Sequence, residues 1–282
     1  MDRHIIILTT DKRQEALGNL FSGKRVRCSW EEYKREEICE KIYVLPTPVT
    51  KLDKNLDLKE KFKQELINCK GPMLVFAGAL NEEWRTFLEK NGIAYWDFMK
   101  LPEVVEGNAQ ITAEATLAEV LKYGRYSVKG QKVLVTGYGC CGRKIAKIFS
   151  VLGAEVLVAA RRQEVREEAA GDGYESVDFS ALKEAVIGVN TVINTVPAQV
   201  ITEEVIANMK EDALVIDIAS NPGGTDFDAA QKYGVEAHLS LGLPGIYTTT
   251  SSALILKNAI SKYAPQQKDV REDREWIFQI II

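Results

Sequence analysis

Histidine, basic runs and long apolar stretches are all scarce in this sequence, and each scarcity excludes a class of protein. Only two histidines occur in 282 residues, His4 and His238. The formal net charge is −4, and no long block of Lys and Arg offers the positive surface that nucleic acids or anionic membranes attract. No apolar stretch approaches the ~20 residues needed to span a membrane. We therefore expect no nucleic-acid partner and no membrane partner.

The cysteine pattern argues against a zinc site and against a secreted, disulfide-bonded protein. There are five, an odd number, and none shows the CxxC spacing of a zinc site or the pattern of a secreted disulfide framework. The amino-terminal stretch MDRHIIILTT carries an apolar run of only four residues, which is shorter than the apolar region of a secretory signal. We therefore predict a cytoplasmic protein with reduced thiols and no bound metal.

Apolar runs alternate with amphipathic segments along the whole chain. This alternation predicts an α/β protein with two Rossmann-like domains, each a mostly parallel sheet with helices on both faces. The strand candidates are residues 4–8, 41–46, 73–78, 93–96, 132–137, 154–160, 190–197, 213–220 and 235–242. Helices are predicted at residues 14–21, 58–67, 81–92, 111–124 and 252–264, and between most of the later strands.

A strong helical pattern at residues 111–124 marks the predicted domain boundary. We expect an N-terminal α/β domain for substrate or partner over residues 1–110, and a dinucleotide-binding domain with this linking helix over residues 111–265. A tail, residues 266–282, has a charged half and an apolar half and could add a strand. It packs either on the body of the chain or on another molecule.

The stretch QKVLVTGYGCCGRKIAKIF contains the pattern G-x-G-x-x-G between a predicted strand and a predicted helix, which is the context of a dinucleotide site. Its first glycine permits a tight turn, the second lets the backbone approach a pyrophosphate, and the third lets helix and strand pack closely. A tight turn without ligand is the alternative. The cofactor-binding candidates in this loop are Gly137, Tyr138, Gly139, Cys140, Cys141 and Gly142. The thiols of Cys140 and Cys141 have two interpretations. They pack within the turn, or the helix start lowers their pKa and they serve a catalytic or redox role.

The following strand ends in VAARR, which favours NADP over NAD. An NAD site usually has Asp or Glu about 20 residues beyond the loop to bind the ribose 2′-hydroxyl. Arg161 and Arg162 stand there instead, and a guanidinium attracts a 2′-phosphate. The alternative is that both arginines are simply solvated.

Later loops follow strands whose carboxyl ends should face a ligand. Asn194, Thr195 and Pro197 are predicted to line the cofactor, as is Asp217. The Gly223–Gly224 pair offers backbone amides to a carboxylate. The two histidines are weak candidates for a general base. His238 is either a general base or a structural residue inside a strand. Glu114 is the other proton acceptor, unless it is only a first-turn carboxylate favoured by the helix dipole.

Several of these stretches together resemble the A subunit of dipicolinate synthase. The similar pieces are GYGCCGRKIAKIFSVLGAEVLVAARR, NTVP, DIASNPGGTDF and GVEAHLSLGLPG, with DKRQ, LPTPVT and TAEA in the first half. The resemblance covers roughly residues 1–263. Departures are Thr248 to Ser252, where the family has a Pro-Lys-Thr-Ala-Gly-like stretch, Asn221 for arginine, Ala115 for glycine, and Thr9 and Thr10 for glycines.

The resemblance implies hydride transfer to NADP from a dihydro- or hydroxytetrahydro-dipicolinate of the lysine pathway, during sporulation. It also implies that a flavoprotein-like B subunit is a partner, besides a possible homo-oligomer. Glu114 and Ser220 are then the expected catalytic residues, with Glu114 taking the ring proton. The expected donors to the substrate carboxylates are Asn221, Gly223, Gly224, Thr248 and Thr249. Two alternatives stay open: another NADP oxidoreductase acting on a small carboxylate, and a non-catalytic NADP(H)-binding scaffold for the flavoprotein.

Overall fold

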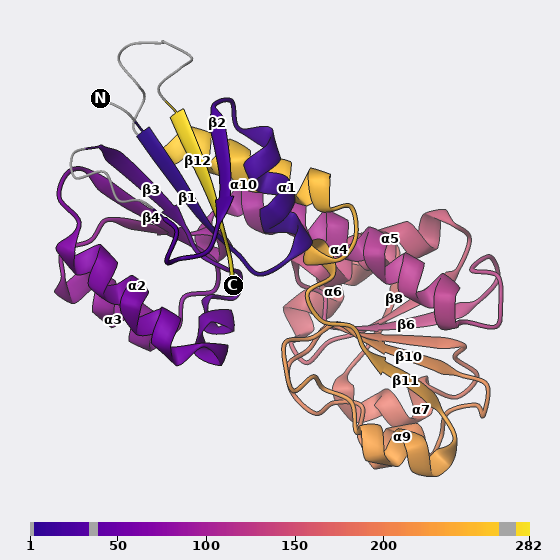
Figure 1. The fold of residues 1–282 in the computed structure, drawn as a ribbon. Coiled ribbons are helices and arrows are strands. Elements are labelled where there is room, and N and C mark those ends of the chain that lie inside the picture. The colour runs from indigo at the N-terminus through magenta and orange to yellow at the C-terminus, as the bar shows by residue number, and fades with distance from the viewer. Residues whose placement is uncertain (1–2, 34–38, 265–274) are drawn as a thin grey trace. The chain divides into compact units, whose positions relative to one another are not determined.

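The computed structural model describes residues 3–33, 39–264 and 275–282. It divides into two compact units (Figure 1), the first made of residues 1–108 with 248–282 and the second of residues 109–247. Each contains a sheet of six strands, and all strand pairings recorded for both sheets are parallel. The predicted fold class is confirmed.

The sheet of the first unit has the strand order β2-β12-β1-β3-β4-β5. Its strands are β1 (Arg3–Thr9), β2 (Lys24–Cys28), β3 (Glu40–Val44), β4 (Met73–Ala77), β5 (Tyr95–Asp97) and β12 (Glu275–Ile281). Its helices are α1 (Lys12–Leu20), α2 (Leu56–Asn68), α3 (Glu82–Lys90) and α10 (Thr249–Tyr263), with 3-10 turns η1 (Val49–Lys54) and η2 (Phe98–Lys100).

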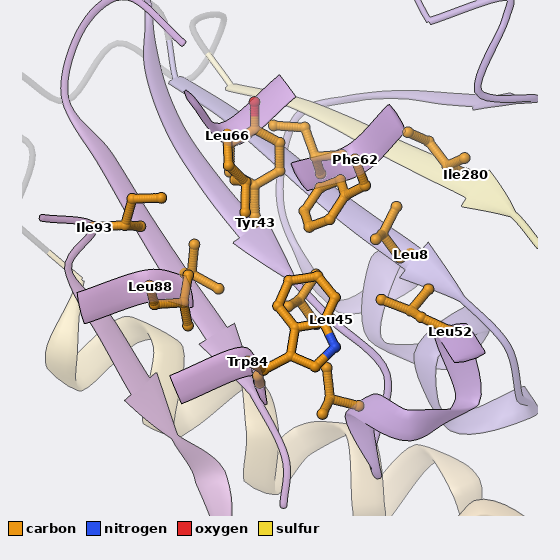
Figure 2. Packing of buried hydrophobic residues seen from close by; sticks show 14 of the residues in the cluster. Leu8, Tyr43, Leu45, Leu52, Phe62, Leu66, Trp84, Leu88, Ile93 and Ile280 are labelled. Atoms are coloured by element: carbon orange, nitrogen blue, oxygen red, sulfur yellow. The ribbon is translucent and has the colours of Figure 1, made fainter. Parts of the chain in front are cut away.

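Alternate residues of the central strand β1 supply the cores on the two faces of this sheet. Ile6 and Leu8 pack with residues of α2 and α3, among them Phe62 and Trp84 (Figure 2). Ile5 and Ile7 pack on the other face with residues of α1 and α10. This two-sided burial explains the continuous apolar run of the strand.

The carboxyl-terminal strand lies inside this sheet, where β12 pairs with β1 on one side and β2 on the other. Its Ile277 and Ile280 are fully buried. The described part of the tail, residues 275–282, therefore packs on the body of its own chain, which was one of the two sequence interpretations. The predicted tail boundary at residue 266 lies outside the described residues.

The sheet of the second unit has the order β11-β10-β9-β6-β7-β8, in which the strand order reverses between β6 and β9. Its strands are β6 (Lys132–Thr136), β7 (Glu155–Ala159), β8 (Glu175–Val177), β9 (Thr191–Asn194), β10 (Leu214–Asp217) and β11 (Glu236–Leu239). Its elements also include α5 (Cys140–Val151), α6 (Gln163–Gly171), α7 (Leu182–Ala185), α8 (Glu203–Ile206), α9 (Phe227–Tyr233), η3 (Phe179–Ala181) and η4 (Leu243–Gly245). A doubly wound sheet of this order binds dinucleotides at the reversal point.

Two details of the predicted domain organisation need correction. Helix α4 runs from Pro102 to Tyr123, so it begins nine residues before the predicted start at 111. Residues 248–264 belong to the first unit rather than the second, because Ala253, Leu256 and Ile260 of α10 are buried against the sheet of that unit. Among the described residues, no helix is both long and apolar enough to cross a membrane.

Candidate functional site

The glycine turn between β6 and α5 has the geometry that its spacing predicts. Gly137 has a positive φ of 86°, which favours glycine. A Cβ on Gly142 would lie 2.1 Å from the carbonyl oxygen of Gly137, so only glycine lets the helix pack this closely on the turn. A Cβ on Gly139, by contrast, would meet no atom within 4 Å. Gly139 therefore borders open space, as close approach by a ligand requires.

The start of α5 provides donors for an anion at this turn. Gly139 is the N-cap residue, no side chain caps the helix, and its first turn holds no acidic residue. Backbone amides in the first turn of a helix lack intrahelical acceptors, and the helix dipole adds partial positive charge there. Bare amides next to an open glycine fit the pyrophosphate of a dinucleotide.

The side chains within the turn serve the fold more than the ligand. Tyr138 is buried and donates from its hydroxyl to Asp172 Oδ2 at 2.7 Å, so only its backbone faces the turn. Cys140 is exposed. Burial raises the pKa of the Cys141 thiol, which favours the packing alternative over the reactive one.

Arg161 and Arg162 follow β7 and are both exposed. In the described part of the chain, neither guanidinium has a recorded hydrogen bond or ion pair. The nearby acid Asp178 is already paired with Arg166 at 2.7 Å, and Arg166 also donates to the carbonyl oxygens of Ala160 and Arg161 at 2.8 Å. The backbone of this segment is thus held in place while two cations stay open to solvent.

The loop after β9 places its three predicted residues differently. Thr195 and Pro197 line a cavity. Asn194 is fully buried, accepts from Thr136 Oγ1 at 2.6 Å and from the amide of Val196 at 3.0 Å, and donates to the carbonyl oxygen of Val196 at 3.1 Å. Its amide group therefore stabilises the loop, and its side chain does not line the cavity.

Asp217 is a second polar residue whose predicted role changes. It is fully buried, and its carboxylate accepts from the amide of Ala219 at 3.0 Å, the amide of Gly224 at 2.7 Å and Thr225 Oγ1 at 2.7 Å. The amide of Gly223 donates to the carbonyl oxygen of Ser220 at 2.9 Å. Both glycine amides are thus engaged inside the loop, which contradicts their predicted role as donors to a substrate carboxylate.

A cavity of about 270 Å³ opens at the carboxyl end of the strands in the second unit. It begins at Cys141 beside the glycine turn and continues past the ends of β9, β10 and β11. The lining residues are Thr112, Cys141, Thr195, Pro197, Ile218, Ala219, Ser220, Ser240, Gly242, Leu243 and Pro244. Hydroxyl groups and apolar surface form this wall, and no lysine or arginine of the described ranges lines it.

Ser220 lines this cavity as predicted, but Glu114 does not. Because α4 begins at Pro102, Glu114 lies within the helix and not at its start. Its side chain is exposed and accepts from Gln110 Nε2 at 2.9 Å. The structure therefore does not bring the two predicted catalytic residues together.

A different carboxylate on the same helix reaches the cavity wall. Glu119 is buried, accepts from Ser240 Oγ at 2.7 Å and accepts from the Tyr247 hydroxyl. Burial alone raises the pKa of Glu119, but the hydrogen bonds from Tyr247 and Ser240 outweigh it and hold the pKa below its ordinary value. Thr112 and Glu119 are seven positions apart, which puts both on one face of a helix. This spacing was the signal in the sequence for Glu119.

None of the remaining candidates is among the residues that line this cavity. His238 stacks on Tyr123 with ring centroids 3.6 Å apart and contacts Glu236 through Nε2 at 2.9 Å, which fits the structural interpretation. Asn221 is exposed and does not line the cavity. Thr248 and Thr249 belong to the first unit, where they lead into α10.

Comparisons with known proteins agree with this geometry. Residues 100–222 match the family model described as the NAD-binding domain of D-isomer specific 2-hydroxyacid dehydrogenases. The A subunit of dipicolinate synthase from Bacillus subtilis is 37% identical over 155 residues, which are 55% of this chain and 52% of that protein. The chain thus spans about half the length of this relative.

Two further comparisons cover more of the chain. An alanine dehydrogenase of Staphylococcus saprophyticus is 25% identical over 262 residues, covering 77% of this chain and 70% of that protein. The crystal structure of the dipicolinate synthase A subunit from Bacillus halodurans superposes with a TM-score of 0.77 at 25% identity, covering 94% of this chain and 98% of that one. The resemblance of this chain to the family of dipicolinate synthase A subunits is therefore confirmed.

Proposed function

We propose that this chain is an NADP-dependent dehydrogenase that forms pyridine-2,6-dicarboxylate from a dihydro- or hydroxytetrahydro-dipicolinate. The observation that carries the proposal is the cavity that starts beside the glycine turn and runs along the carboxyl ends of β9, β10 and β11. In a doubly wound sheet of this order, that region receives the nicotinamide half of the cofactor.

The glycine turn and the start of α5 would hold the pyrophosphate, and Arg161 with Arg162 would hold the 2′-phosphate. The two guanidiniums are exposed and unengaged among the described residues, whereas the nearby Asp178 is neutralised by Arg166. These facts support NADP over NAD, because a 2′-phosphate repels a free carboxylate and is attracted by arginine.

A bound nicotinamide supplies the redox chemistry by accepting a hydride, two electrons and a proton, from the ring carbon of the substrate. From a dihydropyridine, the ring also loses one proton as it becomes aromatic. From a hydroxytetrahydropyridine, water leaves as well. The protein must then orient the ring and accept the proton.

Ser240 would accept that proton with the help of Glu119. Its hydroxyl lines the cavity and donates to the Glu119 carboxylate at 2.7 Å. A proton passed from the substrate to the Ser240 oxygen would move the Ser240 proton to Glu119 along this hydrogen bond. Ser220 and Thr195 offer further hydroxyls in the same wall for positioning the ring.

Turnover by the purified chain tests this proposal. The lysine-pathway precursor and NADP are incubated with the chain, with and without the flavoprotein-like partner, while ultraviolet absorbance follows pyridine-2,6-dicarboxylate and reduced cofactor. We expect one reduced cofactor for each product molecule with the chain alone. An acyclic 2-hydroxy acid serves as the comparison substrate, and preferential oxidation of it would refute the substrate assignment.

The same assay separates a catalyst from a scaffold. If NADPH binds but no product forms until the flavoprotein-like partner is added, and the product then forms without NADP reduction, the chain is a nucleotide-binding scaffold. That result would contradict the dehydrogenase proposal while leaving the dinucleotide site intact.

A further inference from the structure

The turn between β1 and α1 in the first unit is held by hydrogen bonds from nearly every polar residue in it. Asp11 caps α1 by accepting from the amide of Gln14 at 3.0 Å. Gln14 accepts at Oε1 from the amide and hydroxyl of Thr10 at 2.8 and 2.9 Å, and donates to the carbonyl oxygen of Leu45 at 3.1 Å. These contacts fix the turn and join it to the end of β3.

Arg13 differs from its neighbours, since it is buried and has no partner at hydrogen-bond distance among the residues that the structure describes. Its exposed fraction is 4%. Its Nε has no hydrogen-bond partner, and within the described ranges the recorded contact of its guanidinium is with Asp11 Oδ2 at 3.9 Å. That same carboxylate oxygen already accepts from Lys51 Nζ at 2.8 Å. A guanidinium carries five donors, and burying it without acceptors is costly.

The surroundings of Arg13 have an excess of positive charge. Asp11 contributes one negative charge, whereas Arg13 and Lys51 contribute one positive charge each. The start of α1 adds partial positive charge in the same place. The group lies where β1 and β3 end, at the carboxyl edge of a parallel sheet, which is where such sheets bind ligands.

We propose that Arg13, together with Lys51 and the first turn of α1, binds the carboxylate of a small organic acid. A planar guanidinium matches a carboxylate with two parallel hydrogen bonds, and Lys51 adds a point charge. One carboxylate neutralises the single excess positive charge of the group, whereas a phosphate dianion would leave a net negative charge.

The identity of the acid rests on the proposed function, whereas the site itself does not. Within the described ranges, the cavity of the second unit has no lysine or arginine in its wall, so it offers a dicarboxylate no cation of its own. The first probe is pyridine-2,6-dicarboxylate.

Calorimetric titration of the full chain tests the site. Pyridine-2,6-dicarboxylate, inorganic phosphate and uncharged pyridine are titrated in metal-free buffer into the wild type and into Arg13→Met, Arg13→Lys and Arg25→Met. Arg25 is an exposed arginine of the same sheet, bound to Asn19, and serves as the matched control. NADPH is titrated into each variant separately, so that a failure of the dinucleotide proposal stays distinguishable.

We expect the acid to bind the wild type and Arg25→Met equally, and Arg13→Met at least about tenfold more weakly. Arg13→Lys should recover only part of the affinity, and NADPH affinity should be the same in all four proteins. Ligand-free Arg13→Met should melt at or above the wild-type temperature, because it removes an uncompensated buried charge.

Three results would overturn the proposal. The first is equal binding of the acid by the wild type and Arg13→Met, or binding by neither. The second is a ligand-free Arg13→Met that melts well below the wild type, as loss of a structural arginine would cause. The third is phosphate binding as tight as that of the acid and equally dependent on Arg13.

Discussion

Replacing Asp217 by alanine should destabilise the second unit and leave the first unit unchanged. The carboxylate is fully buried and accepts three hydrogen bonds, from the amides of Ala219 and Gly224 and from the Thr225 hydroxyl. Each buried donor left without an acceptor costs about 1–3 kcal/mol. Since the loop can relax and admit water to some of them, we expect a total loss of about 3 kcal/mol, which corresponds to a fall of roughly 6–12 °C in the melting temperature of a unit of this size.

The distribution of tryptophan lets the two units be followed separately. All four tryptophans, Trp30, Trp84, Trp96 and Trp276, belong to the first unit. Tryptophan fluorescence therefore reports the unfolding of the first unit, whereas far-ultraviolet circular dichroism reports both. In Asp217→Ala the dichroism transition should broaden or split toward lower temperature, while the fluorescence transition should not move.

Asp228→Ala is the matched control for this experiment. Asp228 is an exposed carboxylate in the first turn of α9, in the same unit, and its removal should cost at most about 1 kcal/mol. If Asp217→Ala is no less stable than this control, the three hydrogen bonds of Asp217 do not stabilise the second unit. A loss of NADPH affinity without loss of stability would instead restore the direct cofactor role that the sequence suggested.

Three further predictions address the turn, the last strand and the buried carboxylate. Gly142→Val should unfold the second unit, since even a Cβ would lie 2.1 Å from the carbonyl oxygen of Gly137. Gly139→Val should leave the unit folded, because a Cβ there meets no protein atom within 4 Å, but should abolish NADPH binding in a fluorescence titration. A folded Gly142→Val would contradict the close packing of helix on turn. Deleting residues 275–282 removes the strand between β1 and β2. The remaining tryptophans should then become solvent-exposed, while NADPH still binds to the second unit. An unchanged tryptophan emission spectrum would show that β12 is dispensable. Glu119→Gln should cost about 1–3 kcal/mol at pH 7, because an amide nitrogen cannot accept from Ser240 or Tyr247. Although burial raises the pKa of Glu119, the hydrogen bonds lower it overall, so this stabilisation is complete above the unfolded-state pKa of about 4.3 and disappears as the pH falls through the folded-state pKa. Urea denaturation of both proteins from pH 3 to 7 should show them converging at the acid end, and a constant difference would be evidence against the carboxylate.

Local patterns in the sequence predicted the second unit well, because its signals lie within short segments. The strand, glycine turn and helix around Gly139 form one continuous stretch, and the roles of Gly137 and Gly142 follow from spacing alone. The buried strands of the first unit were equally readable from their apolar runs. The exposed edge strand β2, with its sequence KRVRC, was missed because charged residues occupy most of it.

What the sequence did not predict depends on distant pairing. Strand β12 is inserted between β1 and β2 although more than 240 residues separate it from either along the chain, and no local pattern encodes that position. Likewise, α10 follows the dinucleotide-binding segment but packs in the first unit. Both features required knowledge of which core each apolar face joins.

The site predictions failed where polar residues serve the backbone. Asn194 and Asp217 follow buried strands, as cofactor-binding residues do, but their side chains satisfy loop amides that have no other acceptor. Glu114 was taken for a first-turn carboxylate and Glu119 was not considered, because the start of α4 was placed too late. An earlier start at Pro102, a residue common in the first turn of helices, leaves Glu114 exposed and Glu119 buried.

Titration of NADPH and NADH into the wild type and into a variant with both Arg161→Ala and Arg162→Ala tests the central claim most directly. The two guanidiniums are exposed and lack recorded partners among the described residues, so the substitutions should not disturb the fold. We predict that the wild type binds NADPH more tightly than NADH. The double variant should lose at least about tenfold in NADPH affinity, because charge-assisted hydrogen bonds contribute about 1.5–3 kcal/mol. Its NADH affinity should be unchanged. Equal affinities for the two dinucleotides in the wild type would contradict the NADP assignment, and binding of neither would contradict the dinucleotide site itself.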